Sequence, residues 1–226
     1  MLILAVDTSG KDGSVALVKC GGDGCRTLQV VSIEGGTFSA QLIPQISSLL
    51  RQLQLERTQI DAFVAVSGPG SFTGLRVGLA AIKALAEILQ KPIAAISLLE
   101  VSARTCGLQG NVLAASDAGR GEFFCAAYEV ESSRLRLIWQ DLLTPDELLV
   151  RSQDFAVVSP DAKVAGLLTK TRSRLIQVAR PRADEVARPG YEKILRGEIT
   201  FPEALDANYV RRSDAELKSP AGSFKA

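Results

Sequence analysis

The chain has 226 residues, 46% of them hydrophobic, which fits one large or two small globular domains. Its 26 basic and 25 acidic residues nearly balance, and this argues against a protein that binds nucleic acid by itself. The sequence has 0 histidines. This excludes Ser-His-Asp and Cys-His nucleophilic sites and zinc or iron held by imidazole. Catalysis by carboxylates or lysine remains possible. No apolar run reaches the roughly 18 residues that a membrane helix needs, and we expect a cytoplasmic protein.

The start of the chain predicts a β-hairpin followed by a third strand. Residues 2–6 form a short apolar run that ends at Asp7, and strand-like composition resumes over residues 14–18. Glycines within residues 21–24 mark a second turn, and residues 27–33 have the composition of a third strand. These segments are typical of the opening of a central sheet.

The four cysteines do not form a recognisable pattern. Their number is low for a disulfide scaffold, and their spacing does not match a CxxC metal clip. We therefore expect reduced, structural thiols. The cysteines are Cys20, Cys25, Cys106 and Cys125.

Alternating helices and strands are predicted next. Apolar residues recur at helical spacing over residues 39–53, and the apolar run 62–66 is typical of a buried strand. A glycine-rich loop, residues 68–74, then leads into a long helix. After a second buried strand at residues 93–96, the Ser-x-x-Glu spacing of residues 97–100 is that of a capping box, which predicts another helix.

The second half of the chain repeats the opening pattern. Residues 112–116 form an apolar strand, a small-residue turn begins at Asp117, and a strand returns over residues 123–130. Asp7 and Asp117 thus each follow an apolar strand and precede a turn. This weak internal repeat predicts two related α/β subdomains.

We expect an N-terminal α/β subdomain of residues 1–108, a C-terminal α/β subdomain of residues 109–212 and a disordered tail of residues 213–226. A cluster of basic residues lies in the second subdomain. Such a cluster is more often a solvated surface than a nucleic-acid site, and contact with nucleic acid is the minority hypothesis. The cluster consists of Lys170, Arg172, Arg174, Arg180, Arg182 and Arg188.

The glycine-rich loop is the most distinctive motif. Because it follows a strand and precedes a helix, the backbone amides of residues such as Gly70 and Ser71 are candidates to bind a phosphate. A P-loop would require lysine after the last glycine, where Leu75 stands, and a dinucleotide fingerprint would require glycine in place of Thr73. A structural turn that starts a helix is the favoured interpretation.

The turns that begin at Asp7 and Asp117 are the other candidate site. Asp7 with Thr8 and Ser9, opposite Asp117, could hold nucleotide phosphates and Mg²⁺ between two lobes. Alternatively, each aspartate caps its own turn, which is favoured for Asp7 and open for Asp117. The first alternative corresponds to a small Mg²⁺-ATP-dependent kinase or phosphohydrolase, the competing functional hypothesis.

The helix after the glycine-rich loop has two apolar stripes on nearly opposite sides. The first stripe consists of Leu75, Leu79, Ile82, Ala86 and Leu89. The second stripe consists of Val77, Ala81, Ala84 and Ile88. The helix needs one stripe for its own sheet, and the small residues of the second stripe let another helix approach closely. The second stripe either packs under the helix of residues 39–53 or binds a partner. We expect that it binds a partner.

Four blocks of sequence together resemble the TsaB family, also called YeaZ, from Met1 to about Arg212. The blocks are Leu4-Ala5-Val6-Asp7-Thr8-Ser9, the loop of residues 68–74 with Leu75-Arg76-Val77-Gly78, the turn of residues 117–122, and Tyr209-Val210-Arg211. The resemblance implies a shortened actin-like ATPase fold, which is ribonuclease H-like, with two related subdomains. It implies no catalytic residue and no metal site.

The resemblance also implies a function. It identifies a non-catalytic scaffold subunit for the synthesis of threonylcarbamoyladenosine in transfer RNA, which pairs with a TsaD-like catalytic subunit. TsaD ligates its metal partly through histidines, which this chain lacks. Further expected partners are a TsaE-like ATPase and, when the chain is alone, a second copy. Contact with transfer RNA is expected to be indirect, contact with membranes is not expected, and ATP with Mg²⁺ enters only within the complex.

Overall fold

The computed structural model describes residues 1–132, 134–169, 171 and 173–207. The predicted tail of residues 213–226, the Tyr209–Arg211 block, Lys170 and Arg172 lie outside these residues. In the described part of the chain, no helix combines the length and the apolar character needed to cross a membrane.

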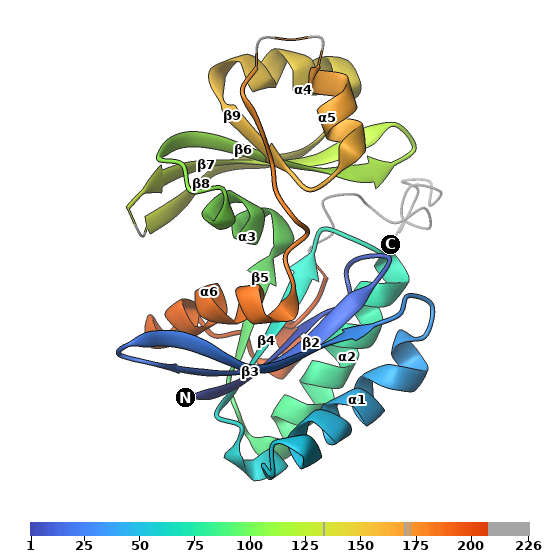
Figure 1. Cartoon of the computed structure of the whole chain (residues 1–226), viewed down its shortest axis with the longest axis vertical. Helices are drawn as coiled ribbons and strands as arrows, with labels where there is room; N and C mark the ends of the chain where they lie inside the picture. The colour runs from blue at the N-terminus through green and yellow to red at the C-terminus, as the bar shows by residue number, and fades with distance from the viewer. Residues whose placement is uncertain (133, 170, 172, 208–226) are drawn as a thin grey trace, which may run out of the picture.

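The chain forms two lobes, each built on a five-stranded sheet (Figure 1). The first sheet has the order β3-β2-β1-β4-β5, in which β1 pairs antiparallel with β2 and parallel with β4. Its strands are β1 (Leu2–Asp7), β2 (Gly13–Gly21), β3 (Gly24–Ile33), β4 (Ala62–Gly68) and β5 (Ile93–Ser97). The central strands β1 and β4 are buried along almost their whole length, as their apolar composition predicts.

Helices cover both faces of the first sheet. The helices α1 (Phe38–Gln52) and α2 (Phe72–Leu89) lie on one face, and α6 (Ala183–Leu195) lies on the other (Figure 1). A short 3-10 turn, η1 (Arg57–Gln59), precedes β4, and η3 (Pro202–Ala204) follows α6. The segment of residues 183–207 falls within the predicted second subdomain, yet it packs in the first lobe, where α6 contacts β1 and β2.

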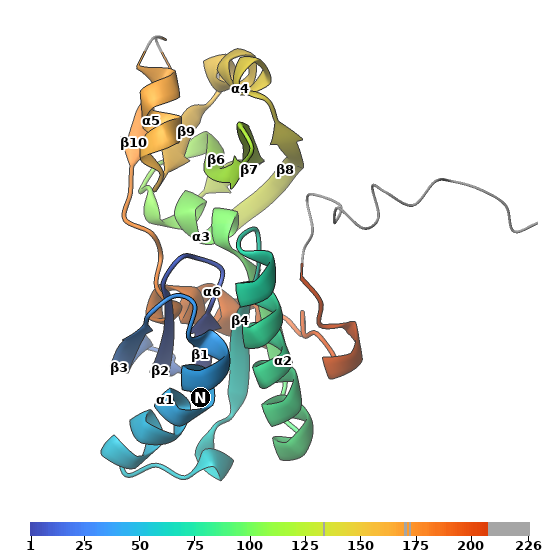
Figure 2. The ribbon, with the colours of Figure 1, turned by 90° about the vertical axis from the view of Figure 1, so that its right-hand side faces the viewer.

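The second sheet has the order β10-β9-β6-β7-β8. Its strands are β6 (Gly110–Gly119), β7 (Glu122–Glu131), β8 (Arg134–Leu143), β9 (Ala156–Ser159) and β10 (Leu175–Gln177). Two helices, α4 (Pro145–Arg151) and α5 (Ala162–Leu168), lie on its outer face, and the turn η2 (Ser152–Asp154) follows α4 (Figure 2). The helix α3 (Leu98–Thr105) lies between the lobes. The predicted fold class, two related α/β units, is confirmed.

The helix α3 joins the cores of the two lobes. Leu98 and Val101 pack in the core of the first lobe, whereas Leu99 and Ala103 pack in the core of the second. The helix begins where the Ser-x-x-Glu spacing predicts it, although the side chain of Ser97 makes no capping hydrogen bond. Because one short helix contributes to both cores, the lobes are packed together rather than tethered.

The expectation of four reduced cysteines is wrong for one pair, because Cys20 and Cys25 form a disulfide. They lie directly opposite each other in the β2–β3 hairpin, with Cα atoms 4.0 Å apart. The glycine-rich turn of residues 21–24 reverses the chain between them and sets this register. Cys106 and Cys125 carry free thiols.

Candidate functional site

The turn after β1 packs directly against the N-terminus of α2. The hydroxyl of Thr8 donates a hydrogen bond to the carbonyl of Gly74 (2.8 Å), and the amide of Ser71 donates one to the carbonyl of Ser9 (2.7 Å). A Cβ atom on Gly74 would lie 2.1 Å from the carbonyl oxygen of Thr8, and one on Gly70 would lie 2.3 Å from that of Ser9. The glycines of the loop therefore allow two backbones to approach closely.

The same contacts occupy amide and hydroxyl groups that would have to be free to bind a phosphate. The amide of Ser71 is bonded to Ser9, and the hydroxyl of Ser71 accepts a hydrogen bond from the amide of Gly74 (3.2 Å), which caps α2. A cavity of about 530 Å³ opens beside this helix end, and Lys11, Asp12 and Glu34 are its charged lining residues. Two carboxylates and one lysine do not favour an anion. The geometry fits a structural turn better than a phosphate site.

Asp7 is surrounded by groups of the protein itself. Its side chain is buried, and its Oδ1 atom accepts hydrogen bonds from the amide (2.8 Å) and the hydroxyl (2.5 Å) of Ser9. The Nη2 atom of Arg180 donates to the same hydroxyl (2.9 Å). Burial raises the pKa of Asp7, and the positive charge of Arg180 and the bonds from Ser9 oppose this shift. The guanidinium of Arg180 is thus linked to the Asp7 carboxylate through the Ser9 hydroxyl.

Asp117 also has protein partners. Its Oδ1 atom accepts a hydrogen bond from the amide of Gly119 (3.0 Å), and its Oδ2 atom accepts one from the Nζ atom of Lys163 (2.5 Å). The bond from Lys163 contributes most to holding the pKa of Asp117 below its usual value. The amide of Asp117 in turn donates to the carboxylate of Asp161 (2.8 Å). Asp117 therefore caps its turn and pairs with a lysine.

Neither aspartate fits a Mg²⁺-nucleotide site in this arrangement. Each carboxylate accepts hydrogen bonds from the chain. Lys163 pairs directly with Asp117, whereas Arg180 is linked to Asp7 through the Ser9 hydroxyl. Within the portion of the chain that the structure describes, no three His, Cys, Asp or Glu residues are grouped so that they could hold a metal ion. The arrangement offers no pair of free carboxylates for phosphoryl transfer.

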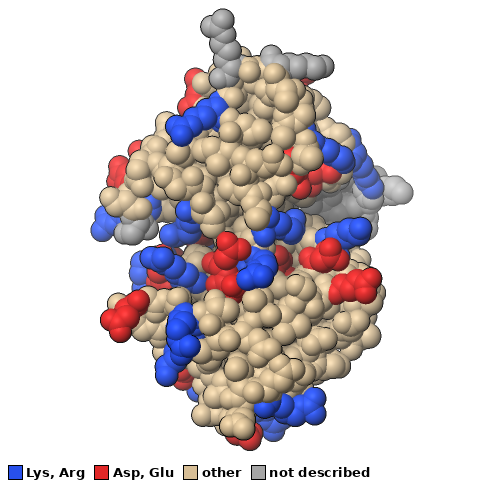
Figure 3. Space-filling model, in the orientation of Figure 1, with Lys and Arg blue, Asp and Glu red and all other residues tan. Residues whose placement is uncertain are grey.

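Three of the described members of the basic cluster have different partners. Arg180 turns inward to Ser9, whereas Arg182 pairs with Asp184 (3.2 Å) and Arg188 pairs with Glu192 (3.5 Å). Acidic and basic side chains are mixed along the boundary between the lobes (Figure 3). On this face, the described residues do not present the concentrated positive charge that is typical of a nucleic-acid site.

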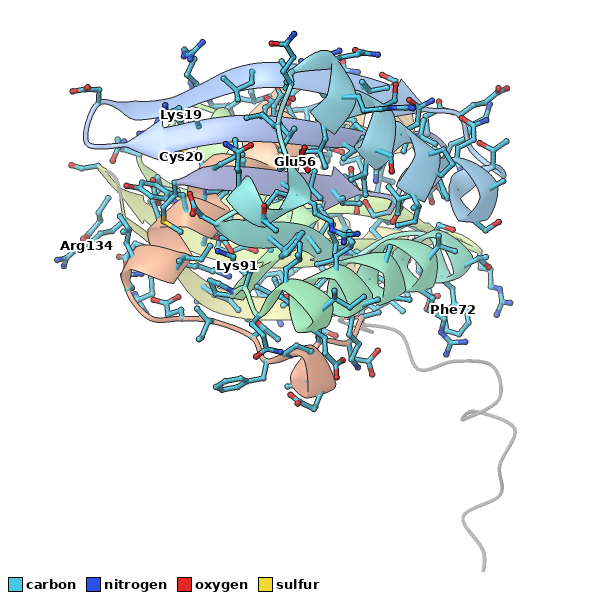
Figure 4. The ribbon with its side chains drawn as sticks, turned by 90° about the horizontal axis from the view of Figure 1, so that it is seen from below. Lys19, Cys20, Glu56, Phe72, Lys91 and Arg134 are labelled. Carbon is cyan, nitrogen blue, oxygen red and sulfur yellow. A yellow bond between two sulfur atoms is a disulfide. The ribbon has the colours of Figure 1, made fainter. Side chains whose placement is uncertain are left out.

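The two stripes of α2 have different environments. In the first stripe, Leu89 is half-buried and the other members are buried. In the second stripe, Val77 and Ala81 pack partly against the core of the first lobe, but Ala84 is exposed and 73% of Ile88 is exposed. Figure 4 shows α2 along the outside of the first lobe, with Phe72 at its outer end. The exposed part of the second stripe is therefore its C-terminal half.

The sequence did not indicate two features of this region. Arg180 belongs to the predicted basic cluster, yet it contacts a turn far away in the sequence. Gly78 lies against Thr8, because a Cβ atom there would be 2.2 Å from the Thr8 hydroxyl oxygen. The spacing of Gly70, Gly74 and Gly78 by four residues is a signal that could have predicted a close contact along one side of α2.

Two lobes with related five-stranded sheets define the actin-like, ribonuclease H-like class of α/β proteins. An activator of 2-hydroxyisocaproyl-CoA dehydratase from Clostridium difficile, solved with bound ADPNP, shares this fold. Its sequence is 12% identical, and the TM-score is 0.50 over 88% of this chain and 97% of that one. YeaZ from Pseudomonas aeruginosa is more similar, with 26% identity and a TM-score of 0.77 over 92% of this chain and 99% of that one.

Sequence comparison gives the family. The model of the TsaD family, tRNA N6-adenosine threonylcarbamoyltransferase, matches residues 35–191. The tRNA threonylcarbamoyladenosine biosynthesis protein TsaB of Bacillus subtilis is 27% identical over 230 residues, 96% of this chain and 97% of the relative. The TsaB protein of Escherichia coli is 27% identical over 239 residues, 97% and 99% of the two chains. The chain belongs to the TsaD family and, within it, to the TsaB (YeaZ) proteins.

Proposed function

We propose that this protein is a non-catalytic subunit for the synthesis of threonylcarbamoyladenosine in transfer RNA, and that it acts in the cytoplasm by binding a TsaD-like catalytic subunit. Its relatives from Bacillus subtilis and Escherichia coli are named for this pathway. The chain has 0 histidines, and Asp7 and Asp117 are both engaged by neighbouring side chains. These observations support a role in binding rather than in chemistry.

The exposed half of the second α2 stripe is the observation that carries the proposal. Ile88 is 73% exposed and lies one helical turn from Ala84, which is also exposed. An apolar surface with small residues lets a partner helix approach closely. We propose that the catalytic subunit binds here, and that a second copy of the chain binds here in its absence.

Direct binding tests this function. The purified chain is mixed with the TsaD-like protein of the same organism, and the masses of the eluting species are measured by size-exclusion chromatography with light scattering. We expect a complex that contains both proteins and that forms at the expense of a homodimer, because both pairings use one surface. If the two proteins elute separately at concentrations of about 10 μM, where most specific complexes form, the proposal is wrong.

A further inference from the structure

The segment between β10 and α6 crosses from the second lobe back to the first (Figure 1). Arg180 lies midway along this segment, and its Nη2 atom donates a hydrogen bond to the hydroxyl of Ser9 (2.9 Å). That hydroxyl donates in turn to Asp7. Further along the segment, the amide of Ala183 donates to the hydroxyl of Ser14 (2.9 Å). The returning segment is therefore anchored to the turn and strand that follow β1.

Burial disfavours an uncompensated negative charge on Asp7. Its side chain is 2% exposed, and an unpaired carboxylate at such a depth is strongly unfavourable. The charge of Arg180 acts on this carboxylate from the returning segment. Gly13 of β2, Gly70 before α2 and Gly74 in its first turn approach the backbone of the turn and carry no titratable group. Ser14 of β2 lies opposite Asp7 in the sheet, and the charged residues Lys11 and Asp12 of the turn are exposed.

The position of Arg180 is consistent with a charge interaction. Its Nε atom is buried and has no hydrogen-bond partner in the described part of the chain, so hydrogen bonding alone does not explain why the guanidinium lies here. Gly10 leaves the room for it, because a Cβ atom on Gly10 would be 2.7 Å from that Nε atom. A larger residue at position 10 would displace the arginine.

We propose that Arg180 is the built-in counter-ion of Asp7, that it acts through the Ser9 hydroxyl to which both side chains are bonded, and that it holds the returning segment on the first lobe. A side chain of the same protein thus compensates the charge of the aspartate that ends β1. This inference concerns the isolated chain and does not depend on whether the chain binds a catalytic subunit.

A double-mutant cycle in thermal unfolding tests the inference, with the variants Arg180→Met, Asp7→Asn and the double variant. We expect Arg180→Met to lower the melting temperature by roughly 10 °C, because it leaves a buried charge without a partner. Asp7→Asn in the same protein should restore at least about half of that loss, since no charge then remains to be compensated. Arg180→Lys, which keeps the charge, should melt closer to the parent than Arg180→Met.

The pH dependence provides a second readout. Burial raises the pKa of Asp7, so its neutral form stabilises the folded state at low pH and this contribution is lost as the pH rises through the raised pKa. Without Arg180 the pKa should rise further. The loss in Arg180→Met should therefore shrink as the pH falls and Asp7 becomes protonated in both proteins, and Asp7→Asn should remove this pH dependence.

Arg188→Met is the matched control, because the side chain of Arg188 is 73% exposed and forms an ion pair on the surface. It should change the melting temperature by less than about 2 °C. The inference is overturned if Arg180→Met also melts within about 2 °C of the parent, or if the losses of the two single variants simply add. Should Arg180→Met fail to fold, a cooperative transition in the double variant supports the inference, and its absence contradicts it.

Discussion

Replacing Gly74 by alanine is expected to lower the free energy of unfolding by about 3 kcal/mol, although alanine is the better helix former. Gly74 lies in the first turn of α2, and the new methyl group would lie 2.1 Å from the carbonyl oxygen of Thr8. That oxygen belongs to the backbone of a buried turn and cannot move aside like the end of a flexible side chain. Either α2 shifts away from the turn, or the turn is distorted.

The same substitution at Gly166 is the control. Gly166 lies within α5, and a Cβ atom there would have no neighbour within 4 Å. Gly166→Ala should raise the free energy of unfolding by up to about 1 kcal/mol, through helix propensity and a less flexible unfolded chain. Urea unfolding of both variants measures the two changes. If Gly74→Ala is as stable as Gly166→Ala, the glycine-rich loop does not serve close packing.

Ala84→Arg is expected to weaken binding to the TsaD-like subunit by about 100-fold or more while leaving the isolated chain folded. Ala84 is exposed, so the long side chain can extend into solvent in the monomer. In a complex, it would stand between two closely packed helices and bring an unpaired charge into their contact. Titration calorimetry and thermal unfolding measure the two effects separately.

Val150→Arg on α4 is the matched control for that variant, because Val150 is an exposed apolar residue, 65% exposed, on a helix of the other lobe. It should leave both the melting temperature and the binding unchanged. If Ala84→Arg unfolds the chain, the second stripe packs internally instead. If Ala84→Arg binds like the parent, the catalytic subunit contacts another surface.

Local patterns were sufficient to predict the elements that position the candidate site. The apolar run at residues 62–66 became the buried strand β4, and the helical spacing over residues 39–53 became α1, because each pattern matches the period of its element. Helix α2 begins at Phe72, inside the predicted loop of residues 68–74, since Ser71 rather than the last glycine caps it. The burial of its first stripe follows from the same periodicity.

Contacts that depend on strand register or on the path of the returning segment could not be predicted. The disulfide depends on the register of the β2–β3 hairpin, which places Cys20 opposite Cys25, and the position of Arg180 depends on how the returning segment passes over the β1 turn. The sequence contains no signal that α6 returns to the first sheet. The charge of Arg180 suggested a solvent-exposed basic cluster, because the periodicity of a sequence does not show which buried carboxylate a cation will meet.

Modification of transfer RNA by purified components tests the proposed role most directly. Unmodified transfer RNA is incubated with a threonylcarbamoyl donor and ATP, and threonylcarbamoyladenosine is measured by mass spectrometry of the nucleosides. We predict no product with this chain alone, little with the TsaD-like and TsaE-like proteins alone, and full modification when all three are present. Modification by this chain alone, or equal modification with and without it, would contradict the role of a non-catalytic subunit on which the catalytic subunit depends.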